Sequence, residues 1–139
     1  MKLLLTLCLL QGLYQPMEMN HINEKDIRSL VSEFIESTDA QEADRLAATL
    51  HDQSMQYVLF GDQLLTFTKA AYLESLKAGK VGGHPRTIQF GEIVSTGETV
   101  ATIKLTASSE TLHFHYQIAL LKHGETWLIT SINTQVERG

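Results

Sequence analysis

The sequence predicts an α+β domain in which three N-terminal helices pack on a curved antiparallel sheet of about six strands. One observation is a C-terminal stretch with apolar residues at every second position, broken by two short turns, as in antiparallel strands. Another is an upstream segment with apolar residues three and four positions apart, the pattern of a helix with one buried side. A helix and a sheet that each carry one apolar face are expected to pack together.

The final strands are expected at Thr99–Ala107, Glu110–Lys122 and Glu125–Asn133. Two-residue loops at Ser108-Ser109 and His123-Gly124 would then set the register of the two hairpins. These loops pair Ile103 with Phe114, Leu105 with Leu112, and Leu120 with Trp127. Both hairpins place the large apolar side chains on the same face, which supports the predicted register.

The opposite face of these strands mixes polar and apolar residues. We expect it to carry Val100, Thr102, Lys104, His113, His115, Gln117, Ala119, Leu121, Leu128, Thr130 and Ile132. Such a face can lie in solvent, or it can form a homodimer interface. The sequence favours the homodimer, through Thr102, His113, His115, Gln117, Leu128 and Thr130.

Length and composition bound the class of protein. A chain of 139 residues is expected to form one domain. Its 43% hydrophobic and 19% charged residues are ordinary for a globular protein. A net charge of −5 without a basic stripe argues against nucleic-acid binding. The single cysteine, Cys8, excludes an internal disulfide and a cysteine-rich zinc site.

The N-terminal segment, residues 1–20, has two interpretations. Lys2 precedes the apolar run Leu3–Leu10, which resembles a signal peptide but is too short to span a bilayer. No small-residue cleavage pattern follows, so the true start can instead be Met17 or Met19. Export, to the periplasm for example, follows from the first interpretation and a cytoplasmic location from the second. The domain itself is expected over residues 21–136, with a tail at 137–139.

Upstream of the final strands, the pattern alternates between helix and strand. Helices are expected at Asp26–Thr38, Glu42–Leu50 and Lys69–Ala78, and strands at Met55–Phe60, Gln63–Phe67 and Arg86–Val94. Asn23 and Thr68 are suitable N-caps for the first and third helices. Gly61-Asp62 is a suitable two-residue hairpin loop. Residues 79–85 contain three glycines without phosphate-binding spacing, so we expect a mobile connector.

Three short sequence motifs suggest a family. They are Leu46-x-x-x-Leu50-His51-Asp52, Leu64-Leu65-Thr66 before Thr68-Lys69-x-x-Tyr72-Leu73, and Ile118-x-Leu120-Leu121-Lys122-x-Gly124-x-x-Trp127-x-Ile129. With the order of elements, they resemble the NTF2-like superfamily, also called the SnoaL-like or cystatin-like cone fold, over about residues 24–134. The branch that the sequence resembles best is named "Putative lumazine-binding". The resemblance implies a cone-shaped sheet around the first helix, a pocket open at one end, and a dimer through the outer face.

Isomerases of this superfamily use a tyrosine on the first helix and an acid on the first strand. The matching positions here are Phe34 and Val58, neither of which can exchange a proton. Related binding proteins often carry an acid just ahead of the final motif, where this chain has Tyr116. The isomerase reaction is therefore not expected, and no catalytic residue is predicted.

Two pairs of residues that contain histidine are candidate sites. His51-Asp52 is expected at a helix end, where adjacent side chains diverge by about 100°, which disfavours a direct pair. His113 and His115 share one strand face about 7 Å apart, but Lys104 lies opposite His113 and no acid is expected nearby. Neither a metal site nor a cofactor is predicted.

The expected function is binding of a small molecule, such as a flat aromatic heterocycle, between the first helix and the sheet. The aromatic residues should mostly point inward, where tyrosine hydroxyls and the indole N–H need partners. The predicted ligand-binding residues are Phe34, Tyr57, Tyr72, Tyr116 and Trp127. One alternative is a cyclase, dehydratase or isomerase-like enzyme that uses His51 or Tyr57 as acid or base. Another is a structural dimerisation domain without a pocket.

Overall fold

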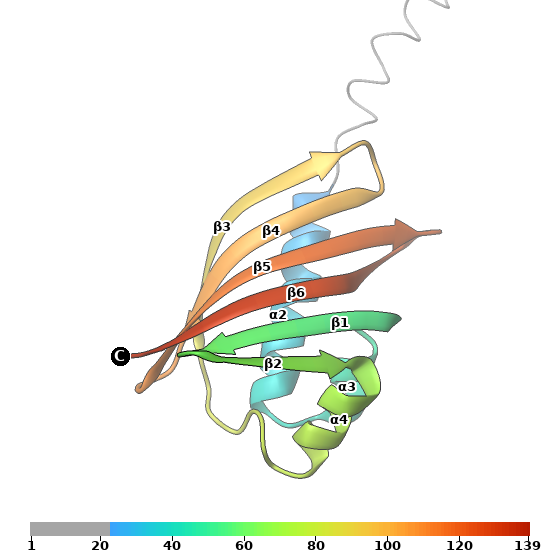
Figure 1. The fold of residues 1–139 in the computed structure, drawn as a ribbon. Coiled ribbons are helices and arrows are strands. Elements are labelled where there is room, and N and C mark those ends of the chain that lie inside the picture. Colours follow the sequence, from blue (N-terminus) through green and yellow to red (C-terminus); the bar gives the residue numbers. More distant parts are fainter. Residues whose placement is uncertain (1–22) are drawn as a thin grey trace, which may run out of the picture.

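The computed structural model describes residues 23–139, which form three helices and a six-stranded sheet (Figure 1). The expectations for residues 1–20 and for Cys8 lie outside this range. The described elements are α2 (Glu24–Asp39), α3 (Ala43–Ala47), β1 (Leu50–Phe60), β2 (Gln63–Thr68), α4 (Lys69–Lys77), β3 (Thr87–Thr96), β4 (Val100–Ser108), β5 (Leu112–His123) and β6 (Thr126–Arg138). The chain is therefore α+β, as the sequence predicts. None of the described helices is both long and apolar enough to cross a membrane.

The first and third predicted helices are present with their predicted caps. The Asn23 side chain accepts a hydrogen bond from the Lys25 amide at the start of α2, and Thr68 accepts one from the Ala71 amide at the start of α4. The second predicted helix is too long, because α3 ends at Ala47 and β1 begins at Leu50. His51 and Asp52 therefore lie in a strand and not at a helix end.

The sheet has the strand order β2-β1-β6-β5-β4-β3. All neighbouring strands are antiparallel except β1 and β6, which are parallel. The prediction of an antiparallel sheet is therefore wrong for this one pair. A short hairpin loop forces antiparallel pairing, but β1 and β6 are far apart in the sequence and no such loop joins them.

Both predicted hairpin registers are wrong, although the predicted faces are right as far as Ile129. Leu105 pairs with Tyr116, four residues beyond the predicted partner, and Leu120 pairs with Ile129, two residues beyond it. Even shifts keep every side chain on its predicted face, because side chains alternate along a strand. The second loop begins at Gly124, whose φ of +64° suits the first position of a tight hairpin turn.

The first loop is longer than predicted because Ser109 stabilises a wider turn. Its Oγ accepts hydrogen bonds from the amides of Thr111 and Leu112, and its own amide donates to the Leu112 carbonyl. Serine readily makes such local bonds, whereas a two-residue hairpin loop favours glycine or asparagine.

A bulge in β6 changes which of its residues face the helices. The pairing steps from Leu120–Ile129 to Ala119–Ser131 and leaves Thr130 without an opposite residue. Beyond this point Ile132, Thr134 and Val136 become the inward residues, and Ile132 is fully buried. The prediction that Ile132 faces outward is therefore wrong. β6 also continues to Arg138, through two of the three residues expected in a tail.

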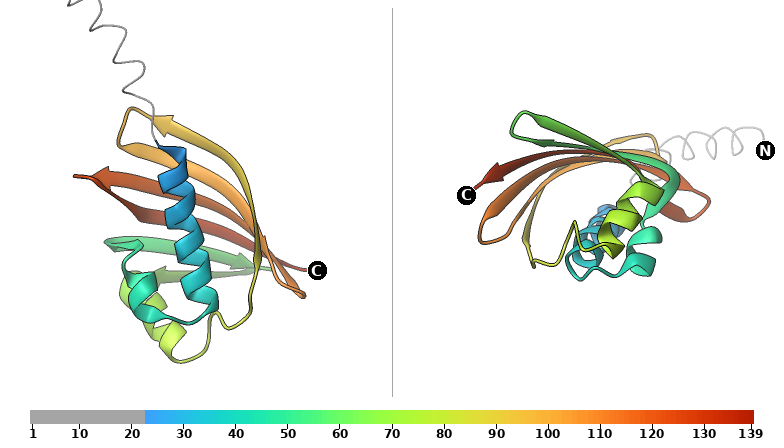
Figure 2. Two further views of the ribbon diagram at one scale, coloured as in Figure 1. Left: turned by 180° about the vertical axis from the view of Figure 1, so that it is seen from behind. Right: turned by 60° about the horizontal axis from the view of Figure 1, so that its bottom comes forward.

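The sheet curves, and the helices lie on its inner side (Figure 2). α2 crosses the strands there, and its Ile27, Val31, Phe34 and Ile35 are fully buried. The strand ends that include the C-terminus of β6 extend past α2 (Figures 1 and 2). A helix about 10 Å wide covers only part of a strand that is about 40 Å long.

Candidate functional site

A cavity of about 440 Å³ lies on the inner face of the sheet, beyond the end of α2. It is bounded by the last residues of α2, α4, the segment 79–86, and the β1–β2 hairpin together with β5 and β6. Its apolar wall includes Val58, Phe60, Leu65, Phe67, Leu112, Phe114 and Val136. We call it the inner pocket. Its size is typical of a small-molecule site.

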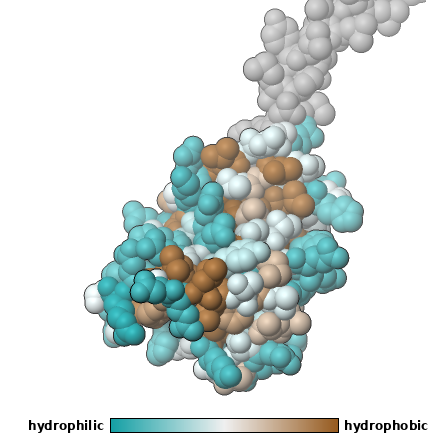
Figure 3. Space-filling view, viewed as in Figure 1, coloured by the Kyte–Doolittle hydropathy of each residue, from teal (hydrophilic) through white to brown (hydrophobic). Residues whose placement is uncertain are grey.

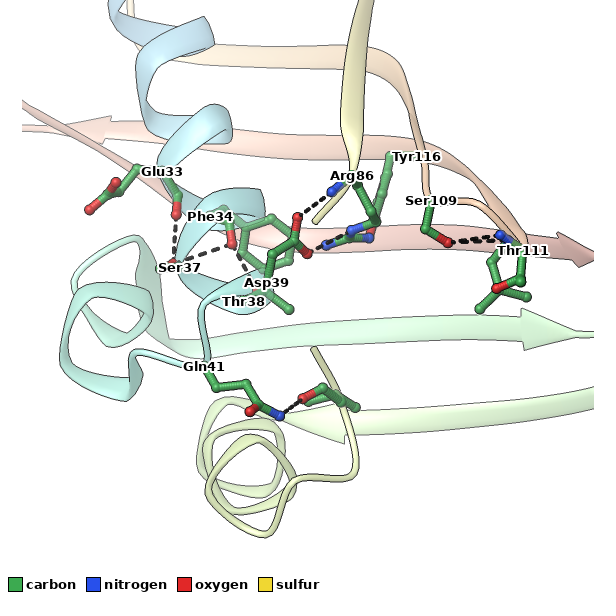
Figure 4. A network of polar contacts seen from close by, with 12 residues as sticks. Glu33, Phe34, Ser37, Thr38, Asp39, Gln41, Arg86, Ser109, Thr111 and Tyr116 are labelled. Carbon is green, nitrogen blue, oxygen red and sulfur yellow. Dashed lines mark hydrogen bonds and ion pairs between the residues drawn. The ribbon is translucent and has the colours of Figure 1, made fainter. Parts of the chain in front are cut away.

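Three polar side chains meet at one wall of the inner pocket (Figure 4). Arg86 Nε donates to Asp39 Oδ1 at 2.8 Å, and the Arg86 amide donates to Asp39 Oδ2 at 3.1 Å. Arg86 Nη1 donates to the Tyr116 hydroxyl at 2.7 Å. The guanidinium also lies over the Phe114 ring, 4.5 Å from its centroid. Its orientation is therefore determined from three sides.

This pair is buried, with 6% of the Arg86 side chain and 11% of the Asp39 side chain exposed. Burial raises the pKa of the Asp39 carboxyl, while the contacts with Arg86 act in the opposite direction. Burial disfavours the charged form of Arg86, but its contacts with Tyr116 and Asp39 outweigh this and raise its pKa. Burial also raises the pKa of Tyr116. Arg86 is thus a permanent cation and Tyr116 a neutral phenol at physiological pH.

The segment 79–86 is held against the end of α2 and is not the plain connector that the sequence predicted. The Gly83 amide donates to the Asp39 carbonyl, and Gln41 Nε2 donates to the Val81 carbonyl (Figure 4). Gly82 has a φ of +80°, and a Cβ there would lie 2.0 Å from the Thr38 carbonyl oxygen. Glycine is required at this contact, and the contact places Arg86 beside Asp39.

Two buried polar groups at the inner pocket have no hydrogen-bond partner among residues 23–139. They are Gln56 Nε2 and Thr134 Oγ1, in side chains of residues that are 3% and 7% exposed. Thr134 is paired with Val58 and Gln56 with Ile132, so the two lie close together on the inner face of β1 and β6. A buried polar group without a partner costs about 1–3 kcal/mol. Such groups mark positions where a ligand or a water molecule is expected to bind.

A second hollow, of about 680 Å³, lies on the outer face of the sheet and is wide open to solvent. We call it the outer groove. Its lining includes Tyr57, Leu59 and Leu64, together with Lys104, His115 and Gln117. The outer face also exposes Val94, Val100 and Leu121. Figure 3 shows separate apolar patches among polar surface.

Residues 23–132 match the family model described as "Putative lumazine-binding". The chain belongs to this family. Its fold is NTF2-like, as the sequence predicts. A search of curated protein sequences found no match to this chain.

Solved structures show the same fold. An NTF2-like protein of unknown function from Shewanella baltica OS155 is 14% identical, with a TM-score of 0.73 over 84% of this chain and 94% of that chain. An NTF-2 like protein from Silicibacter pomeroyi DSS-3 is 12% identical, with a TM-score of 0.72 over 81% and 94%. A ketosteroid isomerase-like protein from Erwinia carotovora atroseptica SCRI1043 is 14% identical, with a TM-score of 0.62 over 81% and 94%. At these identities the likeness shows the fold alone.

In this member of the "Putative lumazine-binding" family, two of the five predicted ligand-binding residues line the inner pocket. Tyr72 and Tyr116 reach it from α4 and β5, and each is 7% exposed. Phe34 lies behind them, stacked on Tyr72 and edge-on to Tyr116, with both ring centroids 6.3 Å away. Phe34 is fully buried and orients the two tyrosine rings.

The other two predicted residues lie elsewhere. Tyr57 is 39% exposed and lines the outer groove, because residues of β1 alternate between the faces and Gln56 takes the inner position. The expectation that Tyr57 points inward is therefore wrong. Trp127 is buried in the hydrophobic core near the start of β6, away from the inner pocket.

The histidines take different positions from those expected. His51 lies in β1, where its Nδ1 accepts a hydrogen bond from the Gln53 amide. His113 pairs with Ser108 in the sheet and not with Lys104, and its Nδ1 lies 2.9 Å from Ser108 Oγ. An acid does lie near His115, whose Nε2 is 3.4 Å from Glu137 Oε2. Within residues 23–139, no cluster of three or more metal-ligating side chains is found.

Sequence reasoning missed Asp39 and Arg86. They are 47 residues apart, between two predicted helices and at the start of a predicted strand, so no local pattern joins them. One signal was present: Arg86 directly follows the segment 79–85, which contains three glycines and ends in Pro85. A segment with three glycines often allows a close approach between two parts of the backbone, which is what it does here.

Proposed function

We propose that this chain is a small-molecule-binding protein whose ligand occupies the inner pocket. The observation that carries the proposal is the pair of unpartnered buried groups, Gln56 Nε2 and Thr134 Oγ1, at the wall of a cavity of about 440 Å³. A protein that never bound a ligand would gain stability from apolar residues at these positions. The family description also favours a ligand-binding role.

The pocket supports a flat ligand with an apolar body. Its wall combines the aromatic rings of Phe67, Tyr72, Phe114 and Tyr116 with a few polar groups, a composition that is usual for sites of aromatic or heterocyclic molecules. The curvature of the sheet around α2 supports the cone that the sequence predicts, with this pocket at its open end. We take Tyr72 and Tyr116 as ligand-contacting residues, and Phe34 as the residue that orients them.

The enzyme alternative has weaker support. Its candidates, His51 and Tyr57, do not line the inner pocket. Arg86 cannot exchange a proton, and both carboxylate oxygens of Asp39 already accept hydrogen bonds from Arg86. The lining of the inner pocket also includes the imidazole of His84. The structural alternative expected no pocket, and a cavity of this size argues against it.

Native mass spectrometry tests the binding proposal. The full chain, purified from its own host, should retain a small molecule that is lost when Val58→Trp fills the inner pocket. Val94→Trp is the matched control, because Val94 is 50% exposed on the outer face. It should retain the molecule. Equal retention by the two variants, or no retained molecule in the unmodified chain, would contradict the proposal.

We further propose a homodimer through the outer face of the sheet. The predicted interface residues Thr102, His113, His115, Gln117, Leu128 and Thr130 lie on β4, β5 and β6. The exposed side chains of Leu59, Leu64 and Leu121 add apolar surface to this face. Burial of such surface in a dimer would be favourable.

Light scattering tests the dimer. Leu64→Asp or Leu121→Asp should convert a dimer to a monomer at micromolar concentration, because each would place a charge at an apolar contact. Ala70→Asp, at an exposed position of α4, is the control and should leave the mass unchanged. A monomeric mass for the unmodified chain would end this proposal.

A further inference from the structure

We propose that the ligand of the inner pocket is a small organic monoanion, an aromatic body with a carboxylate held by Arg86. This inference rests on the proposed function and adds the chemical class of the ligand. It depends on the charges at the pocket wall, the unused donors of Arg86 and Tyr116, and the position of the two unpartnered groups.

The inner pocket is positive within an acidic protein. Its lining includes Asp39, Lys80 and Arg86, so that two permanent or near-permanent cations face one carboxyl group. The whole chain carries a net charge of −5. Charges around one small pocket lie within about one Debye length of a bound ligand at physiological salt. An anion is therefore favoured at this wall, and a cation is disfavoured.

Arg86 retains donors that no described residue uses. Nε and one Nη1 hydrogen are engaged by Asp39 and Tyr116, while Nη2 has no partner within residues 23–139. The Tyr116 hydroxyl accepts from Arg86, so its own proton remains available to a ligand oxygen. A guanidinium and a phenol proton side by side match the oxygens of a carboxylate. Because Asp39 and Phe114 already orient the guanidinium, little further ordering is needed on binding.

The second recognition point lies on the neighbouring strands. Gln56 Nε2 is a donor, and Thr134 Oγ1 is both a donor and an acceptor. An apolar and aromatic wall that includes Val58, Phe67 and Tyr72 accompanies these groups in the same pocket. A ligand that satisfies the whole pocket has its carboxylate at Arg86, a planar body along the rings, and a polar atom toward Gln56 and Thr134.

A matched set of probes on the full chain tests the inference. Naphthoate, naphthamide and naphthylmethylammonium share one ring system and differ in charge. Titrations followed by amide NMR shifts should show naphthoate binding at least about tenfold tighter than naphthamide, with shifts at Arg86, Gln56 and Thr134. The ammonium probe should not shift these amides. Inorganic phosphate is a further arm that separates a carboxylate site from a general anion site.

Variants identify the groups responsible. Lys80→Gln changes an exposed residue, so the fold should be kept, and naphthoate affinity should fall about threefold with naphthamide unchanged. Arg86→Lys keeps the charge but loses the planar fork, and naphthoate affinity should fall tenfold or more. Thr134→Val should leave the ratio of the naphthoate affinity to the naphthamide affinity unchanged, because it removes a group that does not depend on ligand charge.

Equal affinities for naphthoate and naphthamide would overturn the anion inference and leave the binding proposal intact. Shifts from phosphate as large as those from naphthoate would overturn the carboxylate assignment. No shifts from any probe would also overturn this inference, while the retained-molecule experiment with Val58→Trp would still decide the proposed function separately.

Discussion

The inner face of the sheet has two halves that differ in packing. In one half, which we call the packed half, α2 covers the strands, and Ile103, Ile118 and Ile129 are fully buried. In the other, the pocket half, the strands extend past α2, and Phe60, Leu112 and Phe114 are only partly buried. The same sheet thus provides stability in one half and an open, partly polar surface in the other.

The difference shows how the fold separates two requirements. Close packing of apolar side chains supplies most of the free energy of folding and tolerates few polar groups. Recognition of a ligand needs polar groups that stay unpaired until the ligand arrives. The pocket half carries these groups, Gln56 and Thr134, together with the buried Arg86–Asp39 pair. Four predictions test this division, from the largest expected effect to the smallest.

Loss of Arg86 should have the largest effect on stability. In Arg86→Met, Asp39 would remain largely buried without its partner, which should lower the free energy of unfolding by about 3–5 kcal/mol in urea denaturation. Arg28→Met is the control, because its pair with Glu24 has both side chains over 40% exposed. It should cost less than about 1 kcal/mol. Similar losses for the two variants would mean that the buried pair adds no special stability to the pocket half.

Core truncation should separate the two halves directly. Ile118→Ala, in the packed half, removes a fully buried side chain and should cost about 3 kcal/mol of unfolding free energy. Leu112→Ala, in the pocket half, changes a partly buried residue that faces the cavity and should cost about 1 kcal/mol. Equal costs in chemical denaturation would show that the pocket half is packed as tightly as the rest.

The glycine contact at the pocket edge is the third test. Gly82→Ala would place a methyl group against the Thr38 carbonyl in a left-handed conformation and should cost about 2–3 kcal/mol. Gly79→Ala has a similar φ of +74° with nothing within 4 Å of the added carbon, so only the conformational cost of about 1 kcal/mol remains. The melting temperature of Gly82→Ala should be lower than that of Gly79→Ala. The reverse order would contradict the contact between Gly82 and Thr38.

The smallest expected effect is a gain in stability. Thr134→Val replaces an unpartnered buried hydroxyl with a methyl group of similar shape and should stabilise the ligand-free protein by about 1 kcal/mol. Thr130→Val is the control, because the Thr130 hydroxyl donates to the Ala119 carbonyl. The Thr130→Val change should lower the free energy of unfolding by about 0.5–1 kcal/mol. A loss at Thr134 as well would indicate that its hydroxyl already has a partner, such as a bound water.

Up to the bulge at Thr130, the predicted faces of the final strands are correct although both predicted registers are wrong. Side chains alternate strictly, so any even shift leaves Phe114 and Trp127 on their predicted face. The caps at Asn23 and Thr68 and the Gly61-Asp62 loop depend on contacts between neighbouring residues, and the sequence contains all that is needed to predict them.

The candidate site was only half predictable for a related reason. Tyr72 and Tyr116 were found because aromatic residues follow the inward pattern of their elements. Tyr57 was misplaced, and Thr134 was overlooked, because the inward positions of β1 and β6 depend on a parallel pairing and on the bulge at Thr130. One inserted residue reverses every side chain beyond it.

The sequence by itself determined the class of fold, the family and the apolar faces, because periodicity and turn chemistry are properties of neighbouring residues. Only the tertiary structure decided where the pocket lies and which groups line it. Arg86 and Asp39 meet across 47 residues because Gly82 and Gly83 lie against the end of α2. Contacts between distant segments depend on the packing of whole elements, and no local pattern records them.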